Sequence, residues 1–273
     1  MADCDHNCEG CGVENCQSRK IEKVKANEYS HIKHCYAIMS GKGGVGKSLV
    51  TSLLASEMNK RGKSVAIIDA DVTGPSIPQA FGLKGKFATS DDTYIYPVLS
   101  KHGVKVISAN LLMEDEQAPI VWRGPIVSGF VQQLYTDVVY GDVDYMFVDM
   151  PPGTSDIPLT IFQMLPIDGV IVVTSPQDLV SMVVSKSMNM AKMMLIPMVG
   201  VVENMSYVKC PHCNEKIRIY GNDHSKENIE KNGVKVLAEL PIDPNLATLV
   251  DKGQIEDYDC KELSGLIDLL VNE

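Results

Sequence analysis

The chain has 273 residues, a formal net charge of −10 and a hydrophobic fraction of 45%, with only five Phe and one Trp. This length fits one large α/β domain, and the composition predicts a mainly aliphatic core. The negative charge disfavours nucleic acid and anionic membranes as partners, because both are negatively charged themselves. The sequence has no apolar run of the ~18 residues that a membrane span needs. It also lacks the features of a secretory signal. We therefore expect a cytoplasmic protein without nucleic-acid or membrane partners.

Residues 1–17 form a polar leader that holds four of the eight cysteines. The four are Cys4, Cys8, Cys11 and Cys16. In a reducing cytoplasm, clustered cysteines bind metal or do redox chemistry more often than they form disulfides. Four thiolates suffice for a complete iron–sulfur cluster, and a zinc site with the same four, or with His6 in place of one, fits the residues about as well. A leader that binds no metal is the third alternative. Residues 18–33 follow as a polar, basic linker.

From residue 35 onward, short and continuous apolar runs indicate strands that are buried on both faces. They lie at residues 35–40, 64–71, 104–110, 144–151, 169–176, 198–204 and 234–241. Segments of helical length alternate with them at residues 46–60, 126–140, 157–164, 179–194 and 224–231. This alternation predicts one α/β domain over residues 34–273, with a mainly parallel sheet and helices on both of its faces. Residues 84–96, which show no clear element, and a polar insertion at 205–220 interrupt the pattern.

The segment GKGGVGKS follows the first expected strand and opens the first expected helix, which is the context that a phosphate-binding loop requires. Its glycines let backbone N–H groups surround a phosphate, and the helix N-terminus adds a partial positive charge. We expect Lys47 to contact the β- and γ-phosphates of ATP and the Ser48 hydroxyl to bind Mg²⁺. The expected nucleotide-binding residues here are Gly41, Lys42, Gly43, Gly44, Val45, Gly46, Lys47, Ser48 and Leu49.

Aspartates end two of the expected strands. Asp69 and Asp71 close the run VAIIDAD, and Asp149 closes the run YMFVD. An isolated aspartate at such a place is usually a cap or turn residue. Ligands of open α/β sheets, however, bind at the carboxyl ends of the strands. Three carboxylates there, on strands next to a phosphate-binding loop, favour a magnesium site with Asp149 as a ligand, either directly or through water.

The insertion contains a second cysteine motif, formed by Cys210 and Cys213. Two thiolates at this spacing can bind one metal from a tight turn, in zinc and iron–sulfur sites alike. Both kinds of site commonly take four ligands, so two are missing. They could come from the leader, from another side chain such as His212, or from the same insertion of a second subunit. A two-fold dimer makes the last source attractive, because two symmetric pairs can face each other across the axis.

The phosphate-binding loop, with its second lysine, resembles the deviant Walker A motif of the P-loop NTPases that include MinD, ParA and the nitrogenase iron protein (SIMIBI class). This resemblance implies a nucleotide-sandwich homodimer in which Lys42 reaches the partner's phosphates. It implies that Asp71 orients the attacking water and that Asp69 lies in the outer shell of the metal. It also implies that Asn204 reads the adenine and that Pro241 lines the base pocket, although both residue types are common in turns. The expected catalytic residues are Lys42, Lys47 and Asp71, and the expected magnesium ligands are Ser48, Asp69 and Asp149.

Six motifs together resemble the Mrp/ApbC group of iron–sulfur cluster carriers, close to the Nbp/Cfd scaffolds, over residues 34–273. They are GKGGVGKS, DADVTGPSIP, WRGP, DMPPGTSD, TSPQDLV and VVENMSYVKCPHC. The resemblance implies a slow ATPase whose Cys210 and Cys213, from two subunits, bridge one labile [4Fe–4S] cluster that is handed to apo iron–sulfur proteins. It also relates the leader cysteines to the N-terminal ferredoxin-like site of one branch, with a shorter first interval here.

Three other functions compete with this interpretation. A positioning ATPase like MinD or ParA is disfavoured by the short, acidic C-terminal segment, which resembles neither a basic membrane helix nor a basic DNA surface. An electron donor like the nitrogenase iron protein is disfavoured by the adjacent spacing of the CxxC pair. A zinc-bridged regulatory ATPase stays open, because thiolates suit both zinc and iron.

Overall fold

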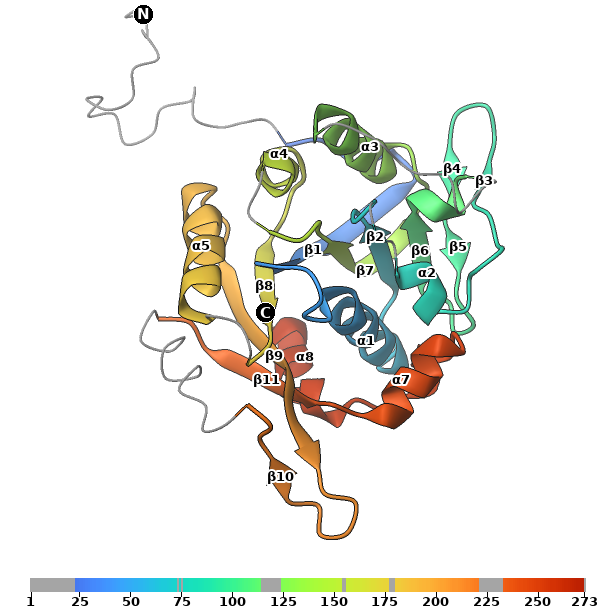
Figure 1. Cartoon of the computed structure of the whole chain (residues 1–273). Coiled ribbons are helices and arrows are strands. Elements are labelled where there is room, and N and C mark those ends of the chain that lie inside the picture. The colour runs from blue at the N-terminus through green and yellow to red at the C-terminus, as the bar shows by residue number, and fades with distance from the viewer. Residues whose placement is uncertain are drawn as a thin grey trace, which may run out of the picture.

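The computed structural model describes residues 23–72, 74, 76–113, 124–153, 156–176, 180–220 and 233–272 of the chain. Its central element is a nine-stranded sheet with helices on both faces (Figure 1). The strands of this sheet are β1 (Ser30–Ser40), β2 (Val65–Asp69), β5 (Val98–Leu99), β6 (Lys105–Ser108), β7 (Gly141–Asp149), β8 (Gly169–Thr174), β9 (Met198–Lys209), β10 (Lys216–Ile217) and β11 (Val236–Pro241). The α-helices are α1 (Lys47–Lys60), α2 (Ile77–Ala80), α3 (Gly124–Thr136), α4 (Asp156–Met164), α5 (Val180–Met193), α7 (Pro244–Asp251) and α8 (Ser264–Asn272). Short 3-10 helices are η2 (Ala109–Leu111), η3 (Ile255–Asp257) and η4 (Lys261–Leu263).

The strands follow the order β10-β9-β8-β1-β7-β2-β6-β5, and β11 pairs with β9. The pairs among β1, β2, β6, β7, β8, β9 and β11 are parallel. Antiparallel pairs are added by β5 on β6 and by β10 on β9. The predicted α/β class with a mainly parallel sheet is therefore confirmed.

Two hydrophobic cores lie on the two faces of the sheet, because successive residues of a strand point to opposite sides. Ala37 and Met39 of β1 join the core that α3, α4 and α5 cover. Tyr36 and Ile38 join the core that α1 and α8 cover. With both faces covered, the edge formed by the carboxyl ends of the parallel strands is the place where polar side chains can gather around a ligand.

The first strand begins earlier than the sequence indicated. β1 starts at Ser30, so the predicted domain boundary at residue 34 lies inside a strand. Its first residues alternate between exposed and half-buried positions, and the continuous apolar run that identified the strand starts only later. The side chain of Asn27 also contacts the domain, since its amide donates hydrogen bonds of 2.9 and 2.8 Å to backbone carbonyls at the end of α3. The part of the predicted linker from residue 23 onward is thus packed on the domain.

Four of the predicted helices correspond to α1, α3, α4 and α5, whereas the helix predicted at residues 224–231 lies outside the described residues. The segment at residues 84–96, left without an element, contains the antiparallel pair β3 (Thr89–Ser90) and β4 (Ile95–Tyr96). Among the described helices, none combines the length and the apolar character needed to cross a membrane.

Two glycines fix how α7 packs against α2. Gly82 and Gly253 follow these helices and adopt left-handed conformations, with φ of +65° and +69°. A Cβ atom on Gly253 would lie 2.4 Å from the Cα atom of Gly82, and one on Gly82 would lie 2.7 Å from the Gly253 carbonyl oxygen. This approach is closer than any side chain allows, so both positions require glycine.

We predict that Gly253→Ala destabilises the protein more than Gly62→Ala does. Gly62 also has a left-handed conformation, with φ of +76°, but an added Cβ would have open space around it. Gly62→Ala should therefore cost about 1–2 kcal/mol for the backbone conformation alone. Gly253→Ala should cost at least about 1 kcal/mol more for the steric overlap. The measurement is urea unfolding followed by circular dichroism, and equal losses for both variants would contradict the close contact.

Candidate functional site

The phosphate-binding loop lies between β1 and α1 and needs glycine at two turns. Gly44 and Gly46 both have φ of +82°, a conformation that other residues adopt only with strain. Gly46 also has a steric requirement, because a Cβ atom there would lie 2.2 Å from the side-chain nitrogen of Asn204. The loop is connected to the end of β7 by a hydrogen bond of 2.8 Å from the Gly153 N–H to the Ser40 carbonyl. The predicted loop is therefore present in the predicted context, with Lys47 and Ser48 in the first turn of α1.

Asp149, at the end of β7, is the centre of a buried polar cluster. Its Oδ2 atom lies 2.6 Å from the Lys47 ammonium nitrogen and accepts a hydrogen bond of 2.6 Å from the Ser48 hydroxyl. Its Oδ1 atom accepts a hydrogen bond of 2.7 Å from the Thr51 hydroxyl. The Asp149 side chain is 0% exposed and that of Lys47 is 6% exposed, so the two charges are paired away from water. Such burial is tolerated because each charge has a close partner.

Asp69 ends β2, the strand next to β7, and Asp71 follows two residues after the strand. Asp69 is in register with Asp149, and its Oδ1 atom accepts a hydrogen bond of 3.2 Å from the Asp71 N–H. Its Oδ2 atom is buried and has no hydrogen-bond partner within the part of the chain that the structure describes. Burial, and then the Asp149 carboxylate, raise the pKa of Asp69 well above its ordinary value. Asp71 has its Oδ2 atom 3.9 Å from the Lys47 nitrogen.

These residues fit a magnesium ion. Mg²⁺ binds oxygen ligands, usually one or two carboxylates together with water and substrate phosphates. Such oxygens are provided at the ends of two neighbouring strands by Asp149 and by the unpartnered oxygen of Asp69. The Ser48 hydroxyl, in the first turn of α1, adds a third. A divalent cation there would also offset the repulsion between the two buried carboxylates. The chemistry of the donor set thus agrees with the predicted magnesium site.

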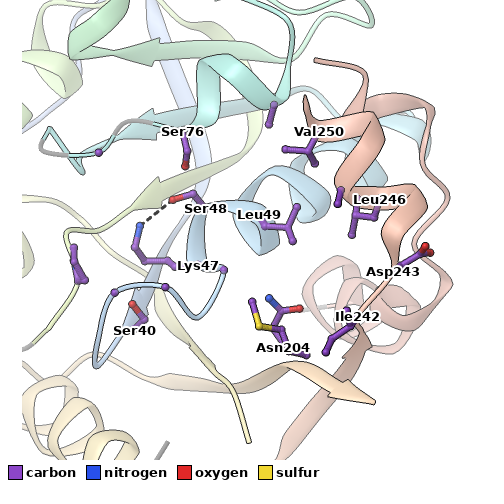
Figure 2. Close-up of a pocket in the computed structure, with 18 of the residues that line it drawn as sticks. Ser40, Lys47, Ser48, Leu49, Ser76, Asn204, Ile242, Asp243, Leu246 and Val250 are labelled. Atoms are coloured by element: carbon purple, nitrogen blue, oxygen red, sulfur yellow. Dashed lines mark hydrogen bonds between the residues drawn. The ribbon is translucent and has the colours of Figure 1, made fainter. Parts of the chain in front are cut away.

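A cavity of about 580 Å³ opens beside this cluster (Figure 2). On one side it is lined by the loop, with Lys47 and Ser48, and by Asp71. On the other side it is lined by apolar residues of α1 and α7, among them Leu49, Leu246 and Val250. Its volume lies within the range of small-molecule sites, roughly 300–1,000 Å³. One polar and one apolar end are what a nucleotide needs for its phosphates and its base.

Asn204 and Pro241, which the family resemblance relates to the base pocket, both line the cavity. The side-chain nitrogen of Asn204 donates a hydrogen bond of 2.9 Å to the Val45 carbonyl, which fixes the side chain against the phosphate-binding loop. Figure 2 shows its amide oxygen turned toward the side of the cavity where α7 lies. An acceptor in this position can receive a hydrogen bond from an exocyclic amino group such as that of adenine.

Several residues that line the cavity were not predicted from the sequence. Met205, Ile242 and Asp243 line it next to the predicted pair, and Ser76 and Ala80 close it from the side of α2. Asp243 caps α7 by accepting a hydrogen bond of 2.8 Å from the Asn245 N–H, a start signal that the sequence does carry. Nothing in the local sequence, however, indicates that this helix packs against α2 and so forms the wall of the site.

Cys210 and Cys213 lie in the turn of a β-hairpin. β9 and β10 pair through Lys209 with Lys216, so the first part of the predicted insertion is the continuation of β9. The turn is closed by a hydrogen bond of 2.9 Å from the Cys210 N–H to the Glu215 carbonyl. Cys210 is half-buried and Cys213 is exposed. The hairpin extends beyond the body of the domain (Figure 1).

The hydrogen bonds of this turn favour the ionised form of Cys210. Hydrogen bonds from the N–H groups of His212 and Cys213, and then from the Cys213 thiol, lower the pKa of Cys210. A lower pKa favours the thiolate, which is the form that binds metals. In the described ranges, no group of three or more Cys, His, Asp or Glu side chains is arranged to hold a metal ion. The described part of one chain therefore offers two ligands at this turn.

Cys35 and Cys260 differ from this pair. Cys35 and Cys260 are buried in the two cores, and burial raises the pKa of Cys260 to about 12 and that of Cys35 further above its ordinary value. Both therefore pack as small apolar residues. The leader cysteines lie outside the described residues; they are Cys4, Cys8, Cys11 and Cys16.

Lys42 lies at the start of the phosphate-binding loop, and its side chain is exposed.

One strand connects the cavity with the cysteine turn. β9 carries Asn204 at the cavity and continues to Lys209, directly before Cys210. Between them the strand is irregular, because Met205 has a left-handed conformation with φ of +59°. Two steps along β11, from Glu239 to Pro241, correspond to four steps along β9 at this point. Such a bulge is a place where a strand can bend.

Comparison with known proteins identifies relatives over nearly the whole chain. Residues 31–269 match the family of NUBPL iron-transfer P-loop NTPases, of the ParA type. The iron–sulfur cluster carrier protein of Clostridium perfringens is 43% identical over 250 residues, which cover 89% of this chain and 87% of that protein. The protein of the same name from Methanocaldococcus jannaschii is 42% identical over 270 residues, which cover 96% of this chain and 93% of that protein.

Solved structures show the same fold. A nucleotide-binding protein of Archaeoglobus fulgidus, in complex with ADP and with cobalt found in it, superposes with a TM-score of 0.77 at 38% identity, covering 85% of this chain and 91% of that protein. MinD in its complex with MinC from Aquifex aeolicus superposes with a TM-score of 0.63 at 19% identity, covering 88% of this chain and 96% of that one. At that identity the second likeness concerns the fold alone, and it agrees with the predicted SIMIBI class.

We predict that iodoacetamide modifies Cys210 and Cys213 well before Cys35 and Cys260 in the metal-free, reduced protein at pH 7. The reason is that the first pair is accessible and Cys210 has a lowered pKa, whereas the pKa values of the buried pair are raised. The rate at Cys210 should rise with pH around a midpoint that is lower than that of an ordinary cysteine thiol. Peptide mass spectrometry measures each site, and protein unfolded in guanidinium provides the control in which all cysteines react. A midpoint at or above the ordinary value would contradict the hydrogen bonding in the turn.

Proposed function

This chain belongs to the family of NUBPL iron-transfer P-loop NTPases, and on that premise we propose that it is an ATP-dependent carrier of iron–sulfur clusters. Its cargo is a labile [4Fe–4S] cluster, bound between two subunits and transferred to apo iron–sulfur proteins in the cytoplasm. The relatives named as iron–sulfur cluster carrier proteins support this proposal, since they match almost the whole chain. The observation that carries it is that one strand, β9, reaches the nucleotide cavity at Asn204 and leads directly into the turn that holds the CxxC pair.

The proposed ATPase uses the buried cluster around Asp149. Lys47 contacts the β- and γ-phosphates, which compete with Asp149 for its ammonium group. Ser48, Asp149 and Asp69 would hold Mg²⁺, and the ion would neutralise charge that develops on the phosphates. Asp71 lies 3.9 Å from the Lys47 nitrogen and is assigned to orient the attacking water. Lys42 is assigned to the phosphates of the partner subunit in a nucleotide-sandwich homodimer.

The proposed cluster site is shared between two subunits. A [4Fe–4S] cluster is commonly held by four thiolates, and the turn of one chain offers two. The turn lies at the tip of a hairpin outside the body of the domain, where the hairpin of a second copy can meet it (Figure 1). Ile217 and Ile219, next to this turn, are 51% and 54% exposed, and a second copy would cover them. Apolar contacts of this kind favour association and keep water from the cargo.

Coupling between the two sites runs along β9. Asn204 and Cys210 are six positions apart, which corresponds to roughly 20 Å in an extended strand. Asn204 is bonded to the phosphate-binding loop through Val45, so a shift of this loop on nucleotide binding moves the strand. The bulge at Met205 lies between the two sites and gives the strand a point at which to bend. We propose that ATP binding and hydrolysis change the position of the hairpin in this way, and that turnover is slow because it depends on cluster exchange.

A second cluster in the leader is part of the proposal. Cys4, Cys8, Cys11 and Cys16 provide four thiolates without help from another chain, and zinc is the alternative occupant. A zinc-bridged regulatory ATPase remains a second candidate function for the whole chain. Its basis is the chemistry of the CxxC pair, because thiolates suit both zinc and iron.

We predict that anaerobic reconstitution with iron and sulfide gives a [4Fe–4S] cluster that the double variant Cys210→Ala/Cys213→Ala loses at the CxxC site. Optical and Mössbauer spectra, with iron and sulfide analysis, measure the cluster content. A variant without residues 1–17 should lose the leader cluster and keep about one cluster per dimer. The matched control is Cys35→Ala/Cys260→Ala, which removes two buried cysteines and should keep the full cluster content.

Two outcomes would contradict the proposal. Uptake of stoichiometric zinc with no cluster, in the wild type, would refute the carrier function and support the zinc-bridged ATPase. Unchanged cluster content in Cys210→Ala/Cys213→Ala would show that the hairpin is not the cargo site.

A further inference from the structure

Asp149 accepts hydrogen bonds from three side chains, and one of these lies outside the phosphate-binding motif. Lys47 and Ser48, which belong to the motif, both contact the Oδ2 atom. Thr51, one helical turn further along α1, donates to the other carboxylate oxygen, Oδ1, at 2.7 Å. Thr51 is 0% exposed, so this hydroxyl has no access to water.

The Thr51 hydroxyl has a single proton and two acceptors within reach. The Asp149 Oδ1 atom lies 2.7 Å away and the Lys47 carbonyl oxygen lies 3.0 Å away. A hydrogen bond to a charged carboxylate is stronger than one to a neutral carbonyl, and the shorter distance agrees with this preference. The main partner of Thr51 is therefore the carboxylate and not the carbonyl of the preceding helical turn.

The two carboxylate oxygens of Asp149 differ in whether their hydrogen-bond donors change partner when a nucleotide binds. Both partners of Oδ2 are groups that the proposed mechanism redirects, Lys47 toward the phosphates and Ser48 toward Mg²⁺. The partner of Oδ1 is not redirected, because Thr51 lies in the helix behind the carboxylate and does not line the cavity as the structure describes it. Among the residues that the structure describes, Thr51 is therefore the side chain that can hold the carboxylate in one orientation before and after binding.

We propose that Thr51 is a positioning residue for the magnesium site, which fixes the Asp149 carboxylate so that its Oδ2 atom faces the metal. This inference rests on the magnesium site of the proposed function. Residues that hydrogen-bond to a metal ligand and orient it typically change metal affinity by roughly 10–100-fold when they are removed. Without the Thr51 hydroxyl, the buried Oδ1 atom loses its donor and the carboxylate can rotate toward Lys47.

The test measures how binding of a fluorescent ADP analogue depends on the Mg²⁺ concentration, without any turnover. Thr51→Val keeps the shape of the side chain and removes the hydroxyl. It should raise the Mg²⁺ concentration for half-maximal binding by at least roughly tenfold, while affinity for the analogue in EDTA stays within about threefold of the wild type. Thr51→Ser, which restores the hydroxyl, should return the Mg²⁺ dependence to near the wild-type value.

Ser52→Ala is the matched control, because Ser52 is also 0% exposed and its hydroxyl donates a hydrogen bond of 2.8 Å to the Ser48 carbonyl. It removes a buried hydroxyl from the same helical turn without touching Asp149, and it should leave the Mg²⁺ dependence unchanged. In an Asp149→Asn background, Thr51→Val should add no further effect, since the residue that it positions has been changed. If the Thr51→Val variant does not fold, the Thr51→Ala variant repeats the test with a smaller side chain.

Different outcomes would refute the magnesium site and the role of Thr51. A wild-type protein that binds the analogue with no dependence on Mg²⁺ would refute the magnesium site itself. A magnesium-dependent wild type together with unchanged Mg²⁺ dependence in Thr51→Val would refute only the role of Thr51. Loss of binding to the same extent with Mg²⁺ and with EDTA, or a Thr51→Ser variant as impaired as Thr51→Val, would assign Thr51 a structural role in α1.

Discussion

The contact between the Lys47 ammonium group and the Asp149 carboxylate, 2.6 Å long and almost fully buried, is the interaction on which the site depends. Either charge alone would be strongly unfavourable in this place, so the first turn of α1 and the end of β7 have to remain together. Their positions determine the rest of the site. The glycine loop before Lys47 has to turn toward the end of the sheet, and β2 brings Asp69 beside Asp149 through its register.

The parallel sheet explains why residues so distant in the sequence meet. Parallel strands end at the same edge, and at this edge β1 supplies the loop, β2 and β7 supply carboxylates, and β9 supplies Asn204. The same geometry gives β9 its special position. It is the strand that reaches the cavity and then continues past the sheet edge into the hairpin that carries Cys210 and Cys213. One strand thus links the nucleotide cavity to the cysteine turn within a single domain.

Much of this arrangement could be predicted, because its signals are local. Continuous apolar runs identified the parallel strands, and the glycine pattern between a strand and a helix identified the loop with Lys47 and Ser48. Signals that depend on contacts distant in the sequence were missed. The start of β1 alternates like a half-buried strand, Thr51 is one of many small residues in α1, and the wall made by α2 and α7 depends on the meeting of Gly82 and Gly253. Each becomes visible only once the chain is folded.

The pairing of Lys47 with Asp149 also bears on the kinetics of nucleotide exchange. When a product such as ADP leaves a phosphate-binding loop, the lysine of the loop loses the phosphate as its counterion. A buried lysine without a counterion is unfavourable. Here the carboxylate can take the place of the departing phosphate at once, so the empty state has its own internal counterion. A nucleotide phosphate that approaches the loop therefore has to displace a counterion that already contacts Lys47.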